Sequence, residues 1–211
     1  MSTSFGILSA QGQAIENQLP ILWLSKPGIP ATPPSWANIA ILTSTQVQNL
    51  QAEISYDQSG WNYNKIGANN QLGAYQISTQ NLETYGLLAA GSNAVYGNDC
   101  VNYRNCWQQV VVRNNTNSYA NYLYNIQSLS GFLTNTVAQD HLAFQIIYDL
   151  YNNLVQAGAI VGTDSAETAA GMIYVGWNLG ISGAFDWRYS NIGNGANYYN
   201  SGRYAIAVLS Q

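Results

Sequence analysis

The sequence predicts a mainly α-helical domain, α+β in class, in which a small β-hairpin region lines a cleft. Apolar residues recur three and four positions apart in several segments that end at a glycine, a pattern typical of amphipathic helices. All five prolines fall within residues 1–34, so the rest of the chain lacks the residue that most strongly breaks helices. Residues 61–77 instead combine three aromatic residues with several asparagines and show no helical period. This segment therefore predicts a short hairpin or a loop.

The chain divides into an arm and a folded domain. A length of 211 residues suits one domain, at roughly 100–200 residues per domain. Residues 1–34 form a proline-rich N-terminal arm without a sustained period, and we expect this arm to dock on a partner protein. Residues 35–211 form the folded domain.

The first helix is expected to begin at Thr43 or Ser44, because Thr43-x-x-Gln46 fits a capping box, in which side chain and backbone bond reciprocally. Gly60 is expected to end it. Its apolar positions are three and four residues apart: Val47, Leu50 and Ile54. Ser78 is expected to cap a second helix that stops at Gly86.

Residues 89–117 look irregular, with a possible short strand at 109–113. A short helix is expected at 128–134. The longest helix is expected from Thr136 to Ala157, with Gly158 ending it. Its apolar stripe consists of Leu142, Ile146, Ile147, Leu150 and Leu154.

The last third of the chain predicts three more helices. Asp164-x-x-Glu167 resembles a capping box and predicts a helix over 165–179 that ends at Gly180. Two shorter helices are expected at 183–190 and 200–209, separated by the polar stretch NIGNGANYYNSG.

Charged residues make up only 8% of the chain, against about 25% in an average globular protein. The net charge is -4 and the six basic residues are scattered, which argues against a nucleic-acid partner. No apolar run approaches the ~18 residues of a membrane span, and the N-terminus lacks the pattern of a secretory signal. A neutral surface with 16 tyrosines suits contact with carbohydrate or burial in a larger assembly.

The two cysteines, Cys100 and Cys106, leave open whether a disulfide forms. A metal site is not expected, because His141 is the only histidine and lies far away in sequence.

Glu53 is the carboxyl group that stands out as a candidate for acid catalysis. No basic residue lies within ten positions of it, and a nearby cation would lower its pKa. A carboxylic acid that protonates a glycosidic oxygen must keep its proton near neutral pH, which requires apolar surroundings. Asp57 lies one helical turn later and either shares the face of Glu53 or caps the helix end.

Twenty residues after Glu53 comes Gly73-Ala74-Tyr75-Gln76-Ile77, and residues 169–180 follow as a late helix. This order resembles the lysozyme superfamily, in the branch of goose-type lysozymes and lytic transglycosylases, where a Gly-Leu-Met-Gln-type motif follows the catalytic Glu. The resemblance covers about residues 44–209. Ile54 and the Ala74-Tyr75 pair depart from the usual residues of the branch.

The resemblance implies cleavage of the MurNAc-GlcNAc β-1,4 bond of peptidoglycan, without a cofactor, with Glu53 as general acid and base. It also implies a set of substrate-binding residues: Trp61, Tyr63, Gly73, Tyr75, Gln76, Tyr174 and Asn178. Residues 58–82 contain no acidic residue, which resembles transglycosylases, where one Glu serves both roles, more than lysozymes.

Phage tail-associated proteins of this superfamily suggest a place in the virion tail or baseplate, acting in the host cell envelope, with residues 1–34 bound to other virion proteins. Two alternatives stay open at this stage. One is a structural phage protein that keeps the lysozyme fold without activity. The other is a module that binds carbohydrate without cleaving it.

Overall fold

A computed structural model describes residues 39–107, 126–191 and 193–207. Within them the chain is mostly helical, which confirms the mainly α prediction. The helices are α2 (Ser44–Ser59), α3 (Thr79–Thr84), α4 (Ser92–Tyr96), α6 (Leu129–Thr134), α7 (Thr136–Gln156), α8 (Ala166–Ser190) and α9 (Gly195–Ala207), with two 3-10 turns, η2 (Gly97–Asn102) and η3 (Arg104–Cys106).

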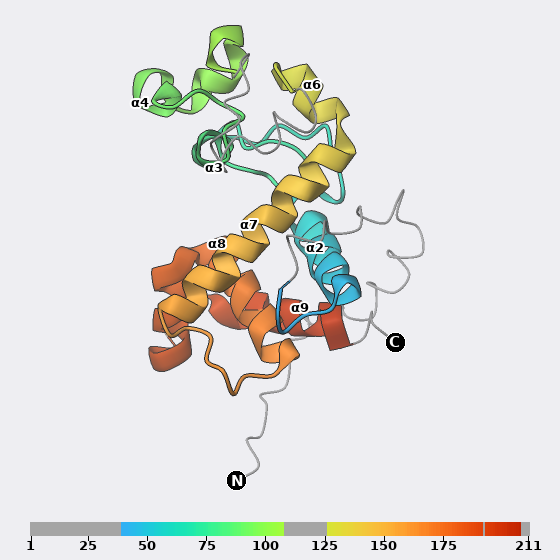
Figure 1. Cartoon of the computed structure of the whole chain (residues 1–211), viewed down its shortest axis with the longest axis vertical. Helices are drawn as coiled ribbons and strands as arrows, with labels where there is room; N and C mark the ends of the chain where they lie inside the picture. The colour runs from blue at the N-terminus through green and yellow to red at the C-terminus, as the bar shows by residue number, and fades with distance from the viewer. Residues whose placement is uncertain (1–38, 108–125, 192, 208–211) are drawn as a thin grey trace.

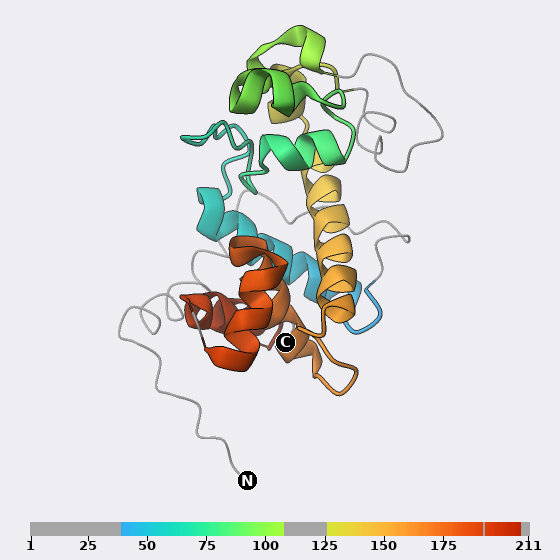
Figure 2. The same ribbon diagram turned by 90° about the vertical axis from the view of Figure 1, so that its left-hand side faces the viewer.

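The long helix α7 connects an upper part to a lower part (Figure 1). The upper part holds α3, α4 and α6, and the lower part holds α8 and α9, with α2 crossing beside α7 between them (Figure 2). The stripe predicted on α7 faces the core: Leu142, Ile147 and Leu154 are fully buried. The central helix thus ties both parts to one continuous core.

The predicted start and end of α2 are confirmed. Thr43 Oγ1 accepts from the backbone N–H of Gln46 at 3.2 Å, and the Gln46 side chain accepts from the Thr43 N–H at 2.9 Å. Gly60 follows the helix with φ 66°, the left-handed conformation that glycine adopts without steric cost. The side chains of Ser78 and Ser128 cap the starts of α3 and α6 by accepting from the backbone N–H three residues further on. Side-chain caps thus fix where the helices of this part of the fold begin.

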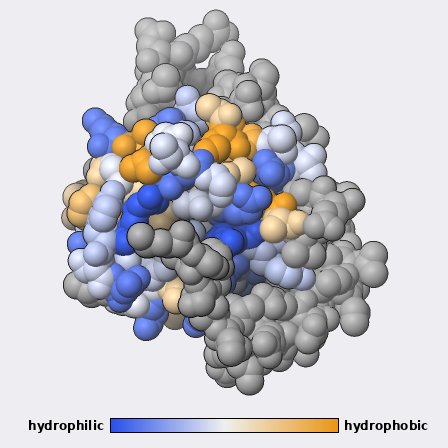
Figure 3. All heavy atoms as spheres, turned by 90° about the horizontal axis from the view of Figure 1, so that it is seen from below, coloured by the Kyte–Doolittle hydropathy of each residue, from blue (hydrophilic) through white to orange (hydrophobic). Residues whose placement is uncertain are grey.

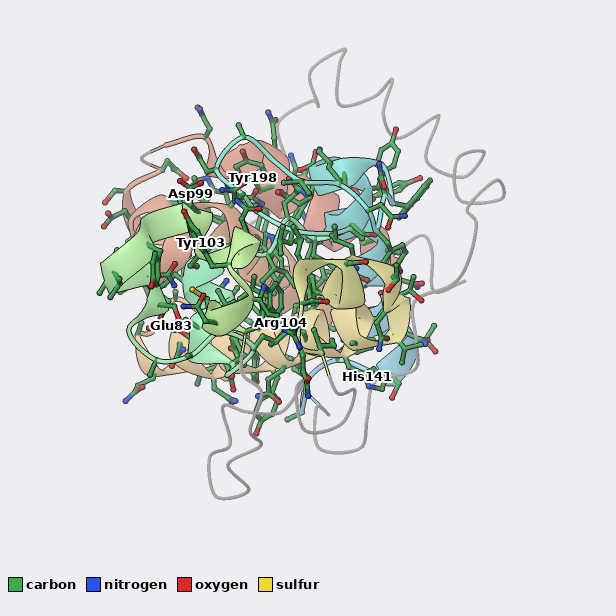
Figure 4. The ribbon with its side chains drawn as sticks, turned by 90° about the horizontal axis from the view of Figure 1, so that it is seen from above. Glu83, Asp99, Tyr103, Arg104, His141 and Tyr198 are labelled. Atoms are coloured by element: carbon green, nitrogen blue, oxygen red, sulfur yellow. The ribbon has the colours of Figure 1, made fainter. Side chains whose placement is uncertain are left out.

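Residues 61–77 fold into tight turns held by two isolated antiparallel bridges, Ile66 with Leu72 and Leu72 with Ile77. Paired strands of a regular hairpin are not seen in this segment. The expected irregular stretch 89–117 contains α4, η2 and η3. The carboxylate of Glu83, on α3, fastens the start of this stretch by accepting from the backbone N–H groups of Gly91 and Asn93. Glu83 lies among these turns at the upper end of the molecule (Figure 4). The possible strand at 109–113 lies outside the described residues.

The capping box predicted at Asp164 is wrong. Ser165 caps α8 by accepting from the Thr168 N–H at 3.2 Å. Asp164 instead accepts from the Val161 N–H and forms a bidentate ion pair with Arg188. The two guanidinium nitrogens of Arg188 lie 2.8 and 2.9 Å from the two carboxylate oxygens. Because its carboxylate is occupied by these partners, the next side chain takes the capping role.

The expected break between two late helices is confirmed at Gly180. Its φ of 73° and ψ of 177° are not helical, so α8 consists of two helical segments that meet at a kink there. The expected start of the last helix at residue 200 is wrong. The polar stretch after α8 is largely helical, since α9 already begins at Gly195. Its aromatic residues pack on α8: Tyr199 lies 4.6 Å from Trp187 between ring centroids.

Close packing of α9 on α8 explains why this polar segment becomes a helix. A Cβ at Gly202 would collide with the carbonyl of Ala170 and the side chain of Tyr174. Glycine therefore lets the two backbones approach. This approach carries Ser201, on the same helix, toward α2.

Among the described residues, none of the helices is both long and apolar enough to cross a membrane. On the face seen from below, hydrophilic and hydrophobic residues alternate over short distances (Figure 3).

Candidate active site

A cavity of about 480 Å³ lies where the upper and lower parts meet. The turn segment contributes Gln71 and Gln76, α7 contributes Asp149, and α8 contributes Trp177 and Asn178. The end of α2 reaches it through Gln58. Its walls therefore offer neutral amides, one carboxylate and an indole ring, all groups that bind sugars through hydrogen bonds or stacking.

Glu53 lies in the middle of α2 and is only 2% exposed. Its Oε2 has no hydrogen-bond partner among the described residues. Burial and the nearby charge of Asp57 raise the pKa of Glu53 from its ordinary 4.5 to about 8, and the hydroxyl of Ser201 opposes this rise. At neutral pH the carboxyl group is therefore mostly protonated.

Asp57 is exposed and lies one helical turn beyond Glu53, on the same face of α2. The hydroxyl of Tyr174, on α8, donates to Asp57 Oδ2 at 2.8 Å. Burial and the charges of Asp57 and Glu53 raise the pKa of Tyr174 well above its ordinary value. Tyr174 thus keeps its proton and donates it in this hydrogen bond. The charges of Glu53 and Asp57 and the hydroxyl of Tyr174 influence one another.

A second bond ties α2 to α8 at the edge of the cavity. Gln58 Nε2 donates to Asn178 Oδ1 at 3.0 Å, and Asn178 Nδ2 donates to the carbonyl of Tyr174. The structure therefore brings together Glu53, Tyr174 and Asn178, which the sequence proposed for one site. Asp57 joins them as a partner of Tyr174, and not as a helix cap.

Gln76 and Gly73 lie on the other side of the cavity, in the turn segment. Gln76 lines the cavity, and its Nε2 donates to the carbonyl of Gly73 at 2.8 Å. A Cβ at Gly73 would collide with the amide of Gln139, whose Oε1 accepts from the Ala74 N–H. Gly73 therefore shapes the turn that presents Gln76.

The other three aromatic candidates make contacts with the interior. Tyr75 is completely buried, and its hydroxyl donates to Asp140 Oδ1 at 2.6 Å while accepting from Gln51 Nε2. Tyr63 donates to the same Asp140 oxygen at 2.7 Å. Trp61 is 8% exposed, and its Nε1 donates to the carbonyl of Ala52.

These contacts place Tyr75 away from Glu53. Gln51, the partner of Tyr75 on α2, lies two residues before Glu53, which puts the two side chains on roughly opposite sides of the helix. The structure thus does not bring the aromatic residues of the turn segment to the face that carries Glu53.

Sequence reasoning missed several residues of the site. One is Asp149, which lines the cavity and accepts from the Tyr85 hydroxyl and the Gln145 side-chain amide. Trp177 and Ser201 were not singled out. Only Trp177 had a signal, since it precedes Asn178 on the expected late helix.

No candidate metal site is found in the part of the chain that the structure describes. That part contains no group of three or more His, Cys, Asp or Glu side chains arranged to hold a metal ion. Cys100 and Cys106 are both free and buried. The groups that the site presents are hydrogen-bonding side chains and the Glu53 carboxyl group with its raised pKa.

Comparison of the chain with models of protein families, with curated proteins and with solved structures gave no significant match. The candidate site therefore rests on its own geometry and on the sequence resemblance.

Proposed function

We propose that this protein cleaves the glycan strand of peptidoglycan at the MurNAc-GlcNAc β-1,4 bond, as a lytic transglycosylase or a lysozyme. The observation that carries the proposal is the buried Glu53, whose pKa of about 8 keeps a proton available at neutral pH. Glycosidic cleavage needs such an acid to protonate the leaving oxygen. Glu53 is accordingly proposed as the general acid and base.

The cavity that α2 reaches through Gln58 supports a sugar as the ligand. Its amides on Gln58, Gln76 and Asn178 can donate to and accept from hydroxyl and N-acetyl groups. Trp177 offers a ring face for stacking. The described residues that line the cavity include no basic side chain, which favours a neutral saccharide over an anionic ligand such as a nucleic acid.

Two reactions fit one protonated carboxyl. In a transglycosylase the 6-hydroxyl of the MurNAc residue attacks its own C1 and yields a 1,6-anhydro end. In a lysozyme, water takes that place and yields a reducing end. We favour the transglycosylase, because the turn segment over 61–77 contributes no carboxylate to the site.

A structural protein without activity is the second candidate. One observation favours it: Glu53 is 2% exposed, so its carboxyl group does not reach the cavity directly. Tyr63, Tyr75 and Trp61 also serve interior contacts. The proposed role in a phage tail or baseplate, with residues 1–34 as a docking arm, suits both candidates and rests on the resemblance, since the arm lies outside the described residues.

Digestion of purified peptidoglycan at neutral pH separates these functions. Wild type is expected to release soluble muropeptides, and E53Q, which cannot deliver the proton, is expected to release at least about 100-fold less, the lower range of acid–base contributions. Asp186→Asn, the same change at an exposed carboxyl on α8, is the matched control and should act like wild type. Mass spectrometry of the products then distinguishes anhydro from reducing ends.

Release of nothing by wild type and both variants would contradict the enzymatic proposal and leave the structural role. Equal release by wild type and E53Q would exclude Glu53 from the chemistry.

A further inference from the structure

We propose that Asp149 fixes the saccharide in the cavity by accepting hydrogen bonds from its donor groups, and that Tyr85 positions the Asp149 carboxylate for this contact. The inference rests on the proposed function and adds the residue that orients the substrate, while Glu53 remains the proposed acid. It is carried by the place of Asp149 in the cavity wall, by the two hydrogen bonds that hold its carboxylate, and by the charge of the surrounding residues.

Close packing of α7 on α8 brings Asp149 and Trp177 to one cavity. A Cβ at Gly176 would lie 3.1 Å from Leu154 Cδ1 and 3.2 Å from Leu150 Cδ1, which is closer than ordinary contact. Glycine at this position therefore lets the two helices approach. Asp149 precedes Leu150, Trp177 follows Gly176, and these four residues all line the cavity. Its wall thus combines a carboxylate from α7 with an indole ring from α8.

Two neutral donors hold the Asp149 carboxylate in place. The Tyr85 hydroxyl donates to Oδ2 at 2.7 Å, and Gln145 Nε2, one turn earlier on α7, donates to Oδ1 at 3.0 Å. Burial and the hydrogen bond to Asp149 raise the pKa of Tyr85 above its ordinary value, so this hydroxyl keeps its proton and stays a donor. Because a carboxylate has about four acceptor positions, each oxygen can still accept from a ligand.

The charge of Asp149 makes it the strongest hydrogen-bond acceptor of the cavity. The described residues that line the cavity include no basic side chain, and their other polar groups are amides, hydroxyls and an indole N–H. A hydrogen bond to an ionised acceptor is roughly twice as strong as one between neutral groups. A sugar O–H or N–H that reaches Asp149 therefore determines where along the cavity the sugar rings lie.

Binding of the trisaccharide (GlcNAc)₃, measured by calorimetry, tests this contact. D149N keeps the shape of the side chain but removes its charge, and it is expected to weaken binding about 10-fold or more, the effect of a hydrogen bond to a charged group. Asp186→Asn, at an exposed carboxyl group of α8 that does not line the cavity, is the matched control and should bind like wild type. Equal affinity of wild type and D149N overturns the inference.

Cellotriose identifies which donor of the sugar Asp149 accepts from, because it carries a hydroxyl where (GlcNAc)₃ carries each acetamido group. If a hydroxyl shared by both ligands donates to Asp149, D149N weakens the binding of both equally. If an acetamido N–H donates, D149N weakens the binding of (GlcNAc)₃ alone. Either result supports the contact and names the substrate group.

A double-mutant cycle tests the positioning role of Tyr85. Y85F is expected to weaken (GlcNAc)₃ binding about 3-fold, the lower range for a neutral hydrogen bond. The double variant Y85F/D149N should bind no more weakly than D149N alone, since Tyr85 acts through the carboxylate. Losses that multiply in the double variant would show that Tyr85 contributes independently and would refute its positioning role.

The ¹³C carboxyl signal of Asp149 in the wild-type protein, assigned through the backbone, tests the contact without any substitution. It is expected to shift when (GlcNAc)₃ is added, and the Asp186 signal is expected to stay. If wild type releases no muropeptides but the Asp149 signal shifts, cleavage is refuted and the contact stands. If wild type is active and the Asp149 signal does not shift, or (GlcNAc)₃ does not bind, the contact is refuted.

Discussion

Glu53 is a carboxyl group that folding removes from water without giving it a cation. On α2 its negative charge would face that of Asp57, and burial removes the solvent that would screen the two. The protonated form avoids both costs. The buried carboxyl group therefore keeps its proton at neutral pH, and its ionisation at alkaline pH lowers the stability of the folded protein.

This loss predicts how stability depends on pH. The pKa of Glu53 is raised from 4.5 to about 8 in the folded protein, so the folded state binds more protons than the unfolded state between these values. The stability that the protonated group provides is complete below about pH 4.5 and is lost as the pH rises toward 8. Relative to E53Q, the free energy of unfolding of wild type should fall by about 1.4 kcal/mol per pH unit in this window.

Urea unfolding of both proteins at a series of pH values measures this difference, with Asp186→Asn as the control that should track wild type. A wild-type to E53Q difference that stays constant from pH 4.5 to 8 would mean that Glu53 titrates normally.

Spacing alone allowed part of this residue-level arrangement to be predicted. Positions 53 and 57, and positions 174 and 178, are each one helical turn apart, so the helical repeat by itself puts each pair on one face. Sequence could not show that Tyr174 reaches across from α8 to Asp57, because that contact depends on how two helices pack. It also could not place Ser201 beside Glu53.

At the scale of elements, the turn segment over residues 61–77 is fastened to α7 and α2 through Asp140. Two tyrosine hydroxyls donate to one oxygen of its carboxylate, and Gln51 donates to Tyr75 and to the Asp140 carbonyl. A buried network of this kind holds the segment in one position, and with it the cavity wall that carries Gln76.

Tyr75→Phe should therefore destabilise the protein by about 1–3 kcal/mol, the usual cost of leaving buried partners unpaired. Chemical unfolding measures the change, and Tyr103→Phe, at a tyrosine that is 48% exposed, should stay within about 0.5 kcal/mol of wild type. Under conditions where both proteins are fully folded, Tyr75→Phe should bind (GlcNAc)₃ as wild type does, since Tyr75 does not line the cavity. Weakened binding with unchanged stability would reassign Tyr75 to the ligand.

Capping residues in the sequence predicted where helices begin when the cap alone determines the start. Thr43, Ser78 and Ser128 begin helices because their side chains satisfy the first free N–H groups. The same logic failed at Asp164, whose carboxylate is bound by Arg188 from 24 positions away. It failed again before Gly195, because α9 is stabilised by packing on α8 and not by a recognisable period.

At the scale of the whole molecule, α7 connects the upper and the lower part (Figures 1 and 2), and a cavity lies where the two parts meet. The sequence predicted the helical class and the presence of a cleft beside residues 61–77. It did not predict which aromatic residues face that cleft. The polar atoms of Trp61, Tyr63 and Tyr75 form hydrogen bonds within the protein, and Trp177 lines the cavity instead.

Which aromatic residues lie in the interior and which line the cavity depends on burial. In a sequence of mostly neutral polar and aromatic residues, the order of residues does not predict which of them become buried. A tyrosine satisfies its hydroxyl equally well on a buried aspartate or on a sugar, so residue type alone does not decide between them.

The position of a bound saccharide decides whether the cavity is an active site, and a crystal structure with a peptidoglycan fragment or a chitooligosaccharide would show it. We expect sugar rings in the cavity between the two parts, with a glycosidic oxygen within about 3 Å of a carboxyl oxygen of Glu53. A saccharide bound to another face of the molecule, or a cavity that stays empty at saturating saccharide, would refute the proposed site.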